Sequence, residues 1–147
     1  MLIDDENAMR AFGKWLSRAL RPGDVVALSG DLGAGKTTLA RAVINGLGYD
    51  GDVPSPSFPL VIPYLPPDVS LPLWHVDLYR IESADEIEAL ALNDALYDGA
   101  LMIEWPERLA GGQWIGALDL RLDMVSNTAR CLTAQVPTSW RTRWPFQ

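Results

Sequence analysis

The sequence has little of what several common protein classes need. Its 147 residues include one cysteine, Cys131, which excludes an internal disulfide framework. No apolar run approaches the roughly 20 residues that a membrane-spanning helix requires. The N-terminal stretch "MLIDDENAMR" carries acids where a secretory signal would carry bases. We therefore expect a cytoplasmic protein with no membrane partner.

Positive charge is also scarce. Lys and Arg together number 12 against 19 Asp and Glu, which gives a formal net charge of −7. Because Lys and Arg dominate binding to phosphate backbones, this balance argues against a broad nucleic-acid surface, and we expect no DNA partner. The C-terminal stretch "SWRTRWPFQ" holds arginines among tryptophans, and we expect its aromatic rings to pack on the rest of the chain.

The remaining composition is that of an ordinary globular protein, with 48% hydrophobic residues, and we expect a single domain over residues 1–147. Apolar residues from 9 to 20 recur near helical spacing after acids at 4–6, which predicts an amphipathic helix. Two more helices are expected, one that begins near residue 36 and one that begins at a capping box of Ser83 and Glu86. Strands are expected at 25–29, 58–64, 100–103, 117–124 and 130–136, and a further strand is expected to end near residue 77. This alternation favours an α/β sandwich.

The most specific pattern is the stretch "SGDLGAGKTTLA" at residues 29–40. The motif G-x-x-x-x-G-K-[ST], the P-loop, begins at Gly30 and ends at Thr37. Its glycines let main-chain N–H groups approach phosphate oxygens, and the helix that follows directs its positive end at the same phosphates. We expect Lys36 at the β- and γ-phosphates and the Thr37 hydroxyl on Mg²⁺. The residues expected to line the phosphate site are Gly30, Asp31, Leu32, Gly33, Ala34, Gly35, Lys36, Thr37 and Thr38.

Two acids end apolar strands, Asp77 after "LPLWHV" and Glu104 after "ALMI". Ligands of open α/β folds bind at the carboxyl ends of the strands, so both carboxylates are expected beside the P-loop. We expect them, with Lys36, to serve catalysis by binding Mg²⁺ and orienting the attacking water. The sequence leaves open which acid has which role. No Asn is followed by Lys, so the Asn-Lys-x-Asp motif of GTPases is absent, which favours ATP.

Four motifs follow one another in the chain, namely "GDLGAGKTTLAR", "SPSF", "HVDLYRI" and "IEWPERL". With them the chain resembles the bacterial TsaE family, also called YjeE, from about residue 30 to 109. The resemblance implies a three-layer α/β sandwich of the P-loop NTPase type around a mixed, mainly parallel sheet. It implies a small ATPase required for threonylcarbamoyladenosine, the modified base next to the anticodon of tRNAs that read codons beginning with A. It also implies TsaD and TsaB as partners, which the ATPase activates or resets, with tRNA contacted only indirectly or weakly.

Carried over by position, the resemblance puts the triphosphate on residues 30–37 and Mg²⁺ on Thr37 and Glu104. It puts Asp77 near the γ-phosphate, where it orients water or supports the metal. Ser57 in "SPSF" stands where the family has Thr in "SPTF". A hydroxyl remains there, so we expect Ser57 to sense the γ-phosphate as part of a switch.

Other positions carry weaker expectations. Arg130, on an expected strand, is predicted to contact phosphate or a partner. Arg80 is predicted to make the same kind of contact, with a salt bridge as an equal alternative. His75, the single histidine, matches the family's "HxDLYR", and we expect a structural hydrogen bond near Asp77 from it. For Trp105 we expect one of three positions: packed on the site, facing a partner, or packed in the core. Ala91 lies where the family often has Gly, so the one feature of the family fold that this difference affects is a local turn at this position.

Two rival functions stay open. A small-molecule kinase of the P-loop class needs an arginine-rich lid, whereas residues 110–124 are predicted to form a loop and a strand. A binding module that is gated by nucleotide without hydrolysis would not need Asp77 and Glu104. No arginine is evident as a finger near the P-loop, so we expect slow turnover alone and faster turnover with a partner.

Overall fold

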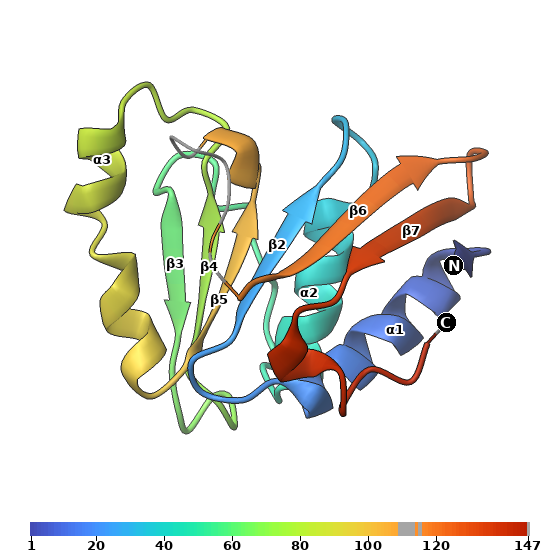
Figure 1. Ribbon diagram of the computed structural model, residues 1–147, viewed down its shortest axis with the longest axis horizontal. Helices are drawn as coiled ribbons and strands as arrows, with labels where there is room; N and C mark the ends of the chain where they lie inside the picture. Colours follow the sequence, from blue (N-terminus) through green and yellow to red (C-terminus); the bar gives the residue numbers. More distant parts are fainter. Residues whose placement is uncertain (109–113, 115, 147) are drawn as a thin grey trace.

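The computed structural model describes residues 1–108, 114 and 116–146. Within them the strands form a seven-stranded sheet in the order β1-β7-β6-β2-β5-β4-β3 (Figure 1). The strands are β1 (Leu2–Ile3), β2 (Val25–Ser29), β3 (Val61–Tyr64), β4 (Leu73–Asp77), β5 (Ala100–Glu104), β6 (Leu118–Met124) and β7 (Arg130–Gln135). The helices are α1 (Glu6–Ala19), α2 (Lys36–Gly46) and α3 (Ala84–Ala89), with 3-10 segments η1 (Leu92–Tyr97), η2 (Pro106–Arg108) and η3 (Thr138–Trp140).

Parallel pairing is confined to the middle of the sheet. β2 pairs in parallel with β5 and β6, and β4 pairs in parallel with β5. The outer pairs β3–β4, β6–β7 and β1–β7 are antiparallel. The expected α/β fold with a mixed sheet is therefore confirmed, but "mainly parallel" is correct only in part. The short segment 125–129 joins β6 to β7, and so short a connection permits only an antiparallel pair.

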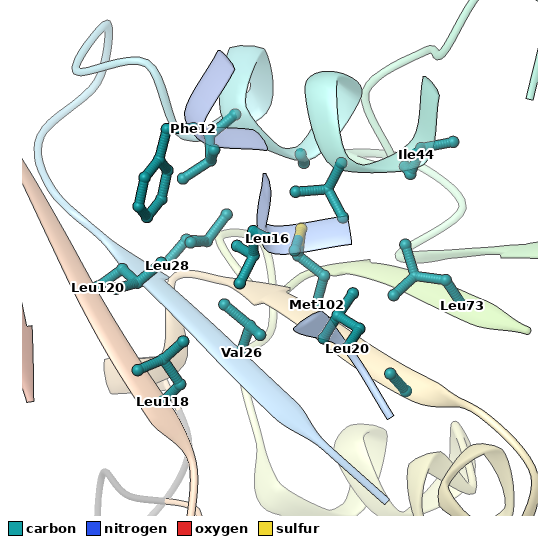
Figure 2. Packing of buried hydrophobic residues seen from close by; sticks show 14 of the residues in the cluster. Phe12, Leu16, Leu20, Val26, Leu28, Ile44, Leu73, Met102, Leu118 and Leu120 are labelled. Carbon is teal, nitrogen blue, oxygen red and sulfur yellow. The ribbon is translucent and has the colours of Figure 1, made fainter. Parts of the chain in front are cut away.

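Helices cover both faces of the sheet. Along β2, Val26 and Leu28 belong to the hydrophobic cluster that contains the buried sides of α1 and α2. The alternate residues Val25 and Ala27 belong to a second cluster, which contains Leu92 of η1. Successive side chains of a strand point to opposite faces, so this division gives the expected three layers. Figure 2 shows the first cluster, in which side chains of α1 pack on those of β2 and β5.

Local signals at the helix ends agree with the sequence. The Asp5 carboxylate caps α1 by accepting from the N–H of Ala8 at 2.8 Å. The capping box of α3 is present, and the Glu86 carboxylate accepts from the N–H of Ser83 at 3.4 Å. The turn after α3 puts Ala91 at φ +51°, a left-handed conformation that glycine adopts more easily.

The edge strands differ from the predictions. The strand expected at 58–64 begins only at Val61. Before it the N–H of Leu60, at φ +68°, donates to the carbonyl of Pro56 at 2.7 Å and closes a turn. The two-residue strand β1 was not predicted, because so short a segment carries no periodic pattern of its own.

The C-terminal stretch returns to α1. The ring centroids of Trp144 and Trp15 lie 5.5 Å apart, and those of Phe146 and Phe12 lie 5.6 Å apart. Packing of this stretch on the rest of the chain, as expected from its aromatic residues, is therefore what the structure shows.

Candidate active site

The loop between β2 and α2 bends through glycines that no other residue replaces without strain. Gly30 has φ +140°, and a Cβ built on it would lie 2.3 Å from the carbonyl oxygen of Leu122. Gly35 caps α2 at φ +107°. These two positions allow the chain to turn back at the sheet edge and to begin α2 with its N-terminus facing the loop.

Within the part of the chain that the structure describes, several main-chain amides of this loop have no hydrogen-bond acceptor. The N–H of Ala34 donates to the carbonyl of Asp31 at 3.1 Å. Among the described residues, no acceptor lies within hydrogen-bond distance of the N–H groups of Gly33, Gly35 and Lys36. Free amides together with the positive end of a helix form a site for an anion.

The Lys36 side chain is folded back over the loop. Only 5% of the residue is exposed. Its Nζ donates to the carbonyls of Gly30 and Asp31, the latter at 2.9 Å, and lies 4.1 Å from the centroid of the Trp105 ring. Burial lowers the pKa of Lys36 below 10.5, while the carboxylate of Glu104 and other nearby acids oppose this change. The ammonium is thus partly desolvated and ready to exchange carbonyl oxygens for an anionic ligand.

Both predicted carboxylates lie at the same edge of the sheet, because β4 and β5 are parallel and Asp77 is in register with Glu104. Glu104 is 2% exposed. Its Oε1 accepts from the Thr37 hydroxyl at 2.9 Å, and its Oε2 lies 2.7 Å from His75 Nε2. Thr37 lies in the first turn of α2, so this contact links the sheet to the start of the helix. The hydrogen bond of His75, expected near Asp77, is made instead to Glu104.

Asp77 has a different set of partners. Its Oδ1 accepts from the N–H of Tyr79 at 2.9 Å, and its Oδ2 accepts from the Ser57 hydroxyl at 3.3 Å. The hydroxyls of Ser57 and Ser55 are 2.8 Å apart. Asp77 therefore connects the sheet edge to the segment 55–57, whereas Glu104 connects it to α2.

Arg130 forms hydrogen bonds with carbonyls of the loop between β2 and α2. Its Nε donates to the carbonyl of Ala34 at 2.9 Å, and its Nη2 donates to that of Gly33 at 3.3 Å. Its Nη1 donates to the carbonyls of Ser126 and Ala129 at 3.0 and 3.1 Å. The guanidinium thus ties the β6–β7 turn to the loop, and the expected phosphate contact of Arg130 stays a prediction.

One cavity of about 310 Å³ brings most of these groups together. Its predicted members are Leu32, Gly33, Gly35, Lys36, Thr37, Thr38, Ser57, Asp77, Glu104 and Arg130, and it also contains Ser55 and Trp105. Three predicted residues, Gly30, Asp31 and Ala34, do not line it. Gly30 and Asp31 contribute carbonyls to Lys36, and Ala34 is buried behind the loop.

A second cavity of about 570 Å³ adjoins the first and shares Gly35, Thr38 and Arg130 with it. It is also lined by residues of the α1 N-terminus and of the β6–β7 turn, among them Asn7 and Asn127. No pattern in the sequence indicates this cavity, because its walls come from segments more than a hundred residues apart.

The other weaker expectations have simple outcomes. Trp105 packs on the site, between Lys36 and Tyr79, whose ring centroid is 4.8 Å from its own. The Arg80 guanidinium lies 4.5 Å from the centroid of Phe58. Residues 110–124 were predicted to form a loop and a strand instead of an arginine-rich lid. Residues 110–113 and 115 of this segment lie outside the described residues, and the strand predicted at its end is β6.

Two further observations bear on ligands. Across the described residues, no set of three or more His, Cys, Asp and Glu side chains is arranged to hold a metal ion. Mg²⁺ differs from such metals, since one or two protein oxygens and the phosphates of a nucleotide commonly bind it. None of the described helices has both the length and the apolar character needed to cross a membrane.

The chain is similar in sequence and in structure to several known proteins. The family model described as "Threonylcarbamoyl adenosine biosynthesis protein TsaE" matches residues 3–132. A protein from Streptomyces coelicolor, named tRNA threonylcarbamoyladenosine biosynthesis protein TsaE, is 42% identical over 140 residues, which cover 92% of this chain and 93% of that protein. A protein of the same name from Rickettsia typhi is 33% identical over 129 residues, covering 87% and 88%. The crystal structure of Bacillus subtilis YdiB superimposes with a TM-score of 0.77 at 26% identity, covering 97% of this chain and 88% of that one.

Proposed function

Because the chain belongs to the TsaE family of threonylcarbamoyl adenosine biosynthesis proteins, we propose that it is a cytoplasmic P-loop ATPase that serves this modification of tRNA next to the anticodon. The proposed reaction is attack of water on the γ-phosphate of ATP. The observation that carries the proposal is the meeting of free loop amides, an ammonium and two carboxylates in one cavity.

The phosphates are assigned to the loop between β2 and α2. Free N–H groups of Gly33, Gly35 and Lys36 supply fixed donors, and the Lys36 ammonium adds a mobile charge. Such preorganised donors stabilise the charge that develops in phosphoryl transfer. The nucleoside is assigned to the adjoining cavity, because that cavity shares Gly35 and Thr38 with the phosphate site.

The oxygen donors near the loop fit Mg²⁺. The Thr37 hydroxyl and the Glu104 carboxylate are 2.9 Å apart, and hard oxygen ligands of this kind suit that ion. When bound, Mg²⁺ would neutralise phosphate charge. We assign it to Thr37 and Glu104, and assign orientation of the attacking water to Asp77, whose partners are the N–H of Tyr79 and the Ser57 hydroxyl.

The signal to partner proteins is assigned to the segment 55–57. Ser57 donates to Asp77 at a long 3.3 Å, and a γ-phosphate nearby would offer its hydroxyl a competing charged acceptor. Gain and loss of this phosphate would then move the segment between two arrangements. We propose that a complex of TsaD and TsaB responds to this change, and that tRNA itself is contacted indirectly or weakly.

Slow turnover in isolation is part of the proposal. Of the described residues that line the cavity, Arg130 is the one arginine, and its guanidinium is bound to loop carbonyls. Partner-supplied groups commonly complete such sites, with rate increases of roughly 10³–10⁵. We therefore expect TsaD–TsaB to stimulate hydrolysis.

The test is single-turnover hydrolysis of ATP by the purified chain, alone and with TsaD–TsaB, together with gel filtration of the mixture with and without ATP. We expect slow hydrolysis alone, faster hydrolysis with the partners, and co-elution that requires ATP. Transfer of phosphate to a small-molecule acceptor would favour the kinase alternative. Co-elution that requires ATP, with no hydrolysis under either condition, would favour a nucleotide-gated binding module.

A further inference from the structure

We propose that His75 is a positioning residue that fixes the Glu104 carboxylate in the orientation required to bind Mg²⁺. The inference rests on the proposed function, since it concerns the metal site of the proposed ATPase. The contact that leads to it is the 2.7 Å distance between His75 Nε2 and Glu104 Oε2.

The two oxygens of Glu104 have separate partners. Oε2 faces His75 on the neighbouring strand β4, and Oε1 accepts from the Thr37 hydroxyl at 2.9 Å. A carboxylate held at both oxygens cannot rotate without breaking one of these hydrogen bonds. Because Thr37 is the other residue assigned to the ion, this orientation brings both donors of the proposed site together.

The hydrogen-bond network also assigns the proton on His75. The residue is fully buried, and within the described part of the chain its Nδ1 has no hydrogen-bond partner. A proton on Nδ1 would be an unsatisfied buried donor, which costs about 1–3 kcal/mol. A proton on Nε2 is instead donated to Glu104 Oε2. Of the two tautomers, these contacts therefore favour the one with its proton on Nε2.

The surroundings of His75 give no other reason for an imidazole. On its strand Leu73 and Asp77 have the same orientation as His75, and the Asp77 carboxylate accepts from Ser57 and Tyr79 instead. Across the sheet His75 pairs in register with Met102 and Ile62. Leu73 and Met102 are fully buried. An aliphatic side chain would suit these apolar neighbours, but it would leave the buried Glu104 Oε2 without its His75 partner. Within the described residues the one polar contact of the His75 ring is to Glu104, so the contribution of the ring concerns the carboxylate.

Residues of this kind, which orient a metal ligand from behind it, change metal affinity by roughly 10–100-fold when replaced. The test compares His75→Leu, which removes the donor, with His75→Gln, whose amide N–H can reach the same oxygen. Leu73→Val is the matched control, because it alters the same strand and face without a polar contact to Glu104.

Two affinities are measured for each variant, that of ADP without metal by calorimetry and that of Mn²⁺ for the ADP complex by electron paramagnetic resonance. We expect His75→Leu to lose roughly 10–100-fold in Mn²⁺ affinity with metal-free ADP binding within about twofold of the wild type. We expect His75→Gln to recover most of this loss and Leu73→Val to show none. Unchanged Mn²⁺ affinity in His75→Leu, an equal loss with and without metal, or a folded His75→Gln that recovers nothing would each overturn the proposal.

A second measurement uses the wild-type protein, so its outcome does not depend on whether a variant folds. His75 is the only histidine of the sequence, so the ring signals in a long-range ¹H–¹⁵N spectrum of the tag-free chain belong to it. We expect the Nε2–H tautomer, and an Nδ1–H tautomer would refute the assignment. If the wild type binds no metal–nucleotide complex, the proposed function itself fails. If it does and the His75 variants match it, this inference alone fails.

Discussion

Replacing Lys36 with alanine removes the ammonium that lies over the loop, and its effect on nucleotide affinity follows from the contacts of Nζ. In the structure Nζ donates to the carbonyls of Gly30 and Asp31 and lies over the Trp105 ring. On binding ATP or ADP we expect it to exchange the neutral carbonyls for charged phosphate oxygens. The affinity it contributes is therefore a difference between two sets of hydrogen bonds.

The size of this difference is worked from typical hydrogen-bond energies. Hydrogen bonds that involve a charged group contribute about 1.5–3 kcal/mol each, and exchange of a neutral carbonyl for a charged phosphate oxygen moves a Lys36 bond from the lower to the upper end of this range, a gain of about 1.5 kcal/mol for each carbonyl exchanged. Exchange of two carbonyls gives about 3 kcal/mol, or on the order of a 100-fold loss of affinity in Lys36→Ala. Stability should change little, by about 1 kcal/mol or less, because burial already disfavours this charge and lowers the pKa of Lys36.

The assay is calorimetric titration of the variant with Mg²⁺–ADP, with urea denaturation to check the fold. The chain contains one other lysine, Lys14, which is exposed on α1 and gives a matched control in Lys14→Ala. We expect wild-type affinity for the control. Equal affinity of Lys36→Ala and the wild type would refute the assignment of Lys36 to the phosphates, and a large loss of stability would refute the account of its burial.

Three further predictions concern the site and its frame. Glu104→Gln should lower magnesium-dependent hydrolysis in single-turnover assays by roughly 100-fold while metal-free ADP affinity stays within about twofold; turnover at the wild-type rate would contradict the metal assignment. Gly30→Ala should lower the free energy of unfolding in urea by about 3 kcal/mol or more, since its Cβ would lie 2.3 Å from the Leu122 carbonyl oxygen. Gly33→Ala, whose Cβ meets nothing within 4 Å, should lose clearly less, and equal losses would argue against the contact. Burial raises the pKa of Asp119, so the penalty for its charge is absent below the ordinary pKa of an aspartate, grows as pH rises from there to the raised pKa, and is complete above it. Asp119→Asn should thus be more stable than the wild type at pH 7 and equally stable below both pKa values of Asp119, and a gap that does not close at low pH would contradict this cause.

Local patterns of the sequence predicted the elements that carry their own signal. The capping residues Asp5 and Ser83 mark the starts of α1 and α3 as expected. The strand at Val25–Ser29 has the predicted bounds, and α2 begins at Lys36 as the P-loop motif requires. These predictions succeed because capping, periodicity and motif spacing depend on residues a few positions apart.

Predictions that depend on distant residues were less complete. The sequence placed Asp77 and Glu104 at strand ends, but it did not reveal that one contacts Ser57 and the other Thr37. It associated His75 with Asp77, two residues away, whereas the partner in the fold is Glu104 on the next strand. The strand after Leu60 was predicted too long, because the turn that precedes it has no distinctive pattern.

The sequence by itself determined the chemistry available at the loop: glycines for close approach, a lysine, a threonine hydroxyl and the positive end of a helix, all within eight residues of one another. Only the tertiary structure decided which carboxylate meets that hydroxyl, which histidine nitrogen faces the carboxylate, and how the α1 N-terminus and the β6–β7 turn form a second cavity beside the loop. The physical reason is that strand order and register set these distances, and pairing in a sheet is fixed by burial of the whole hydrophobic face and not by any single segment.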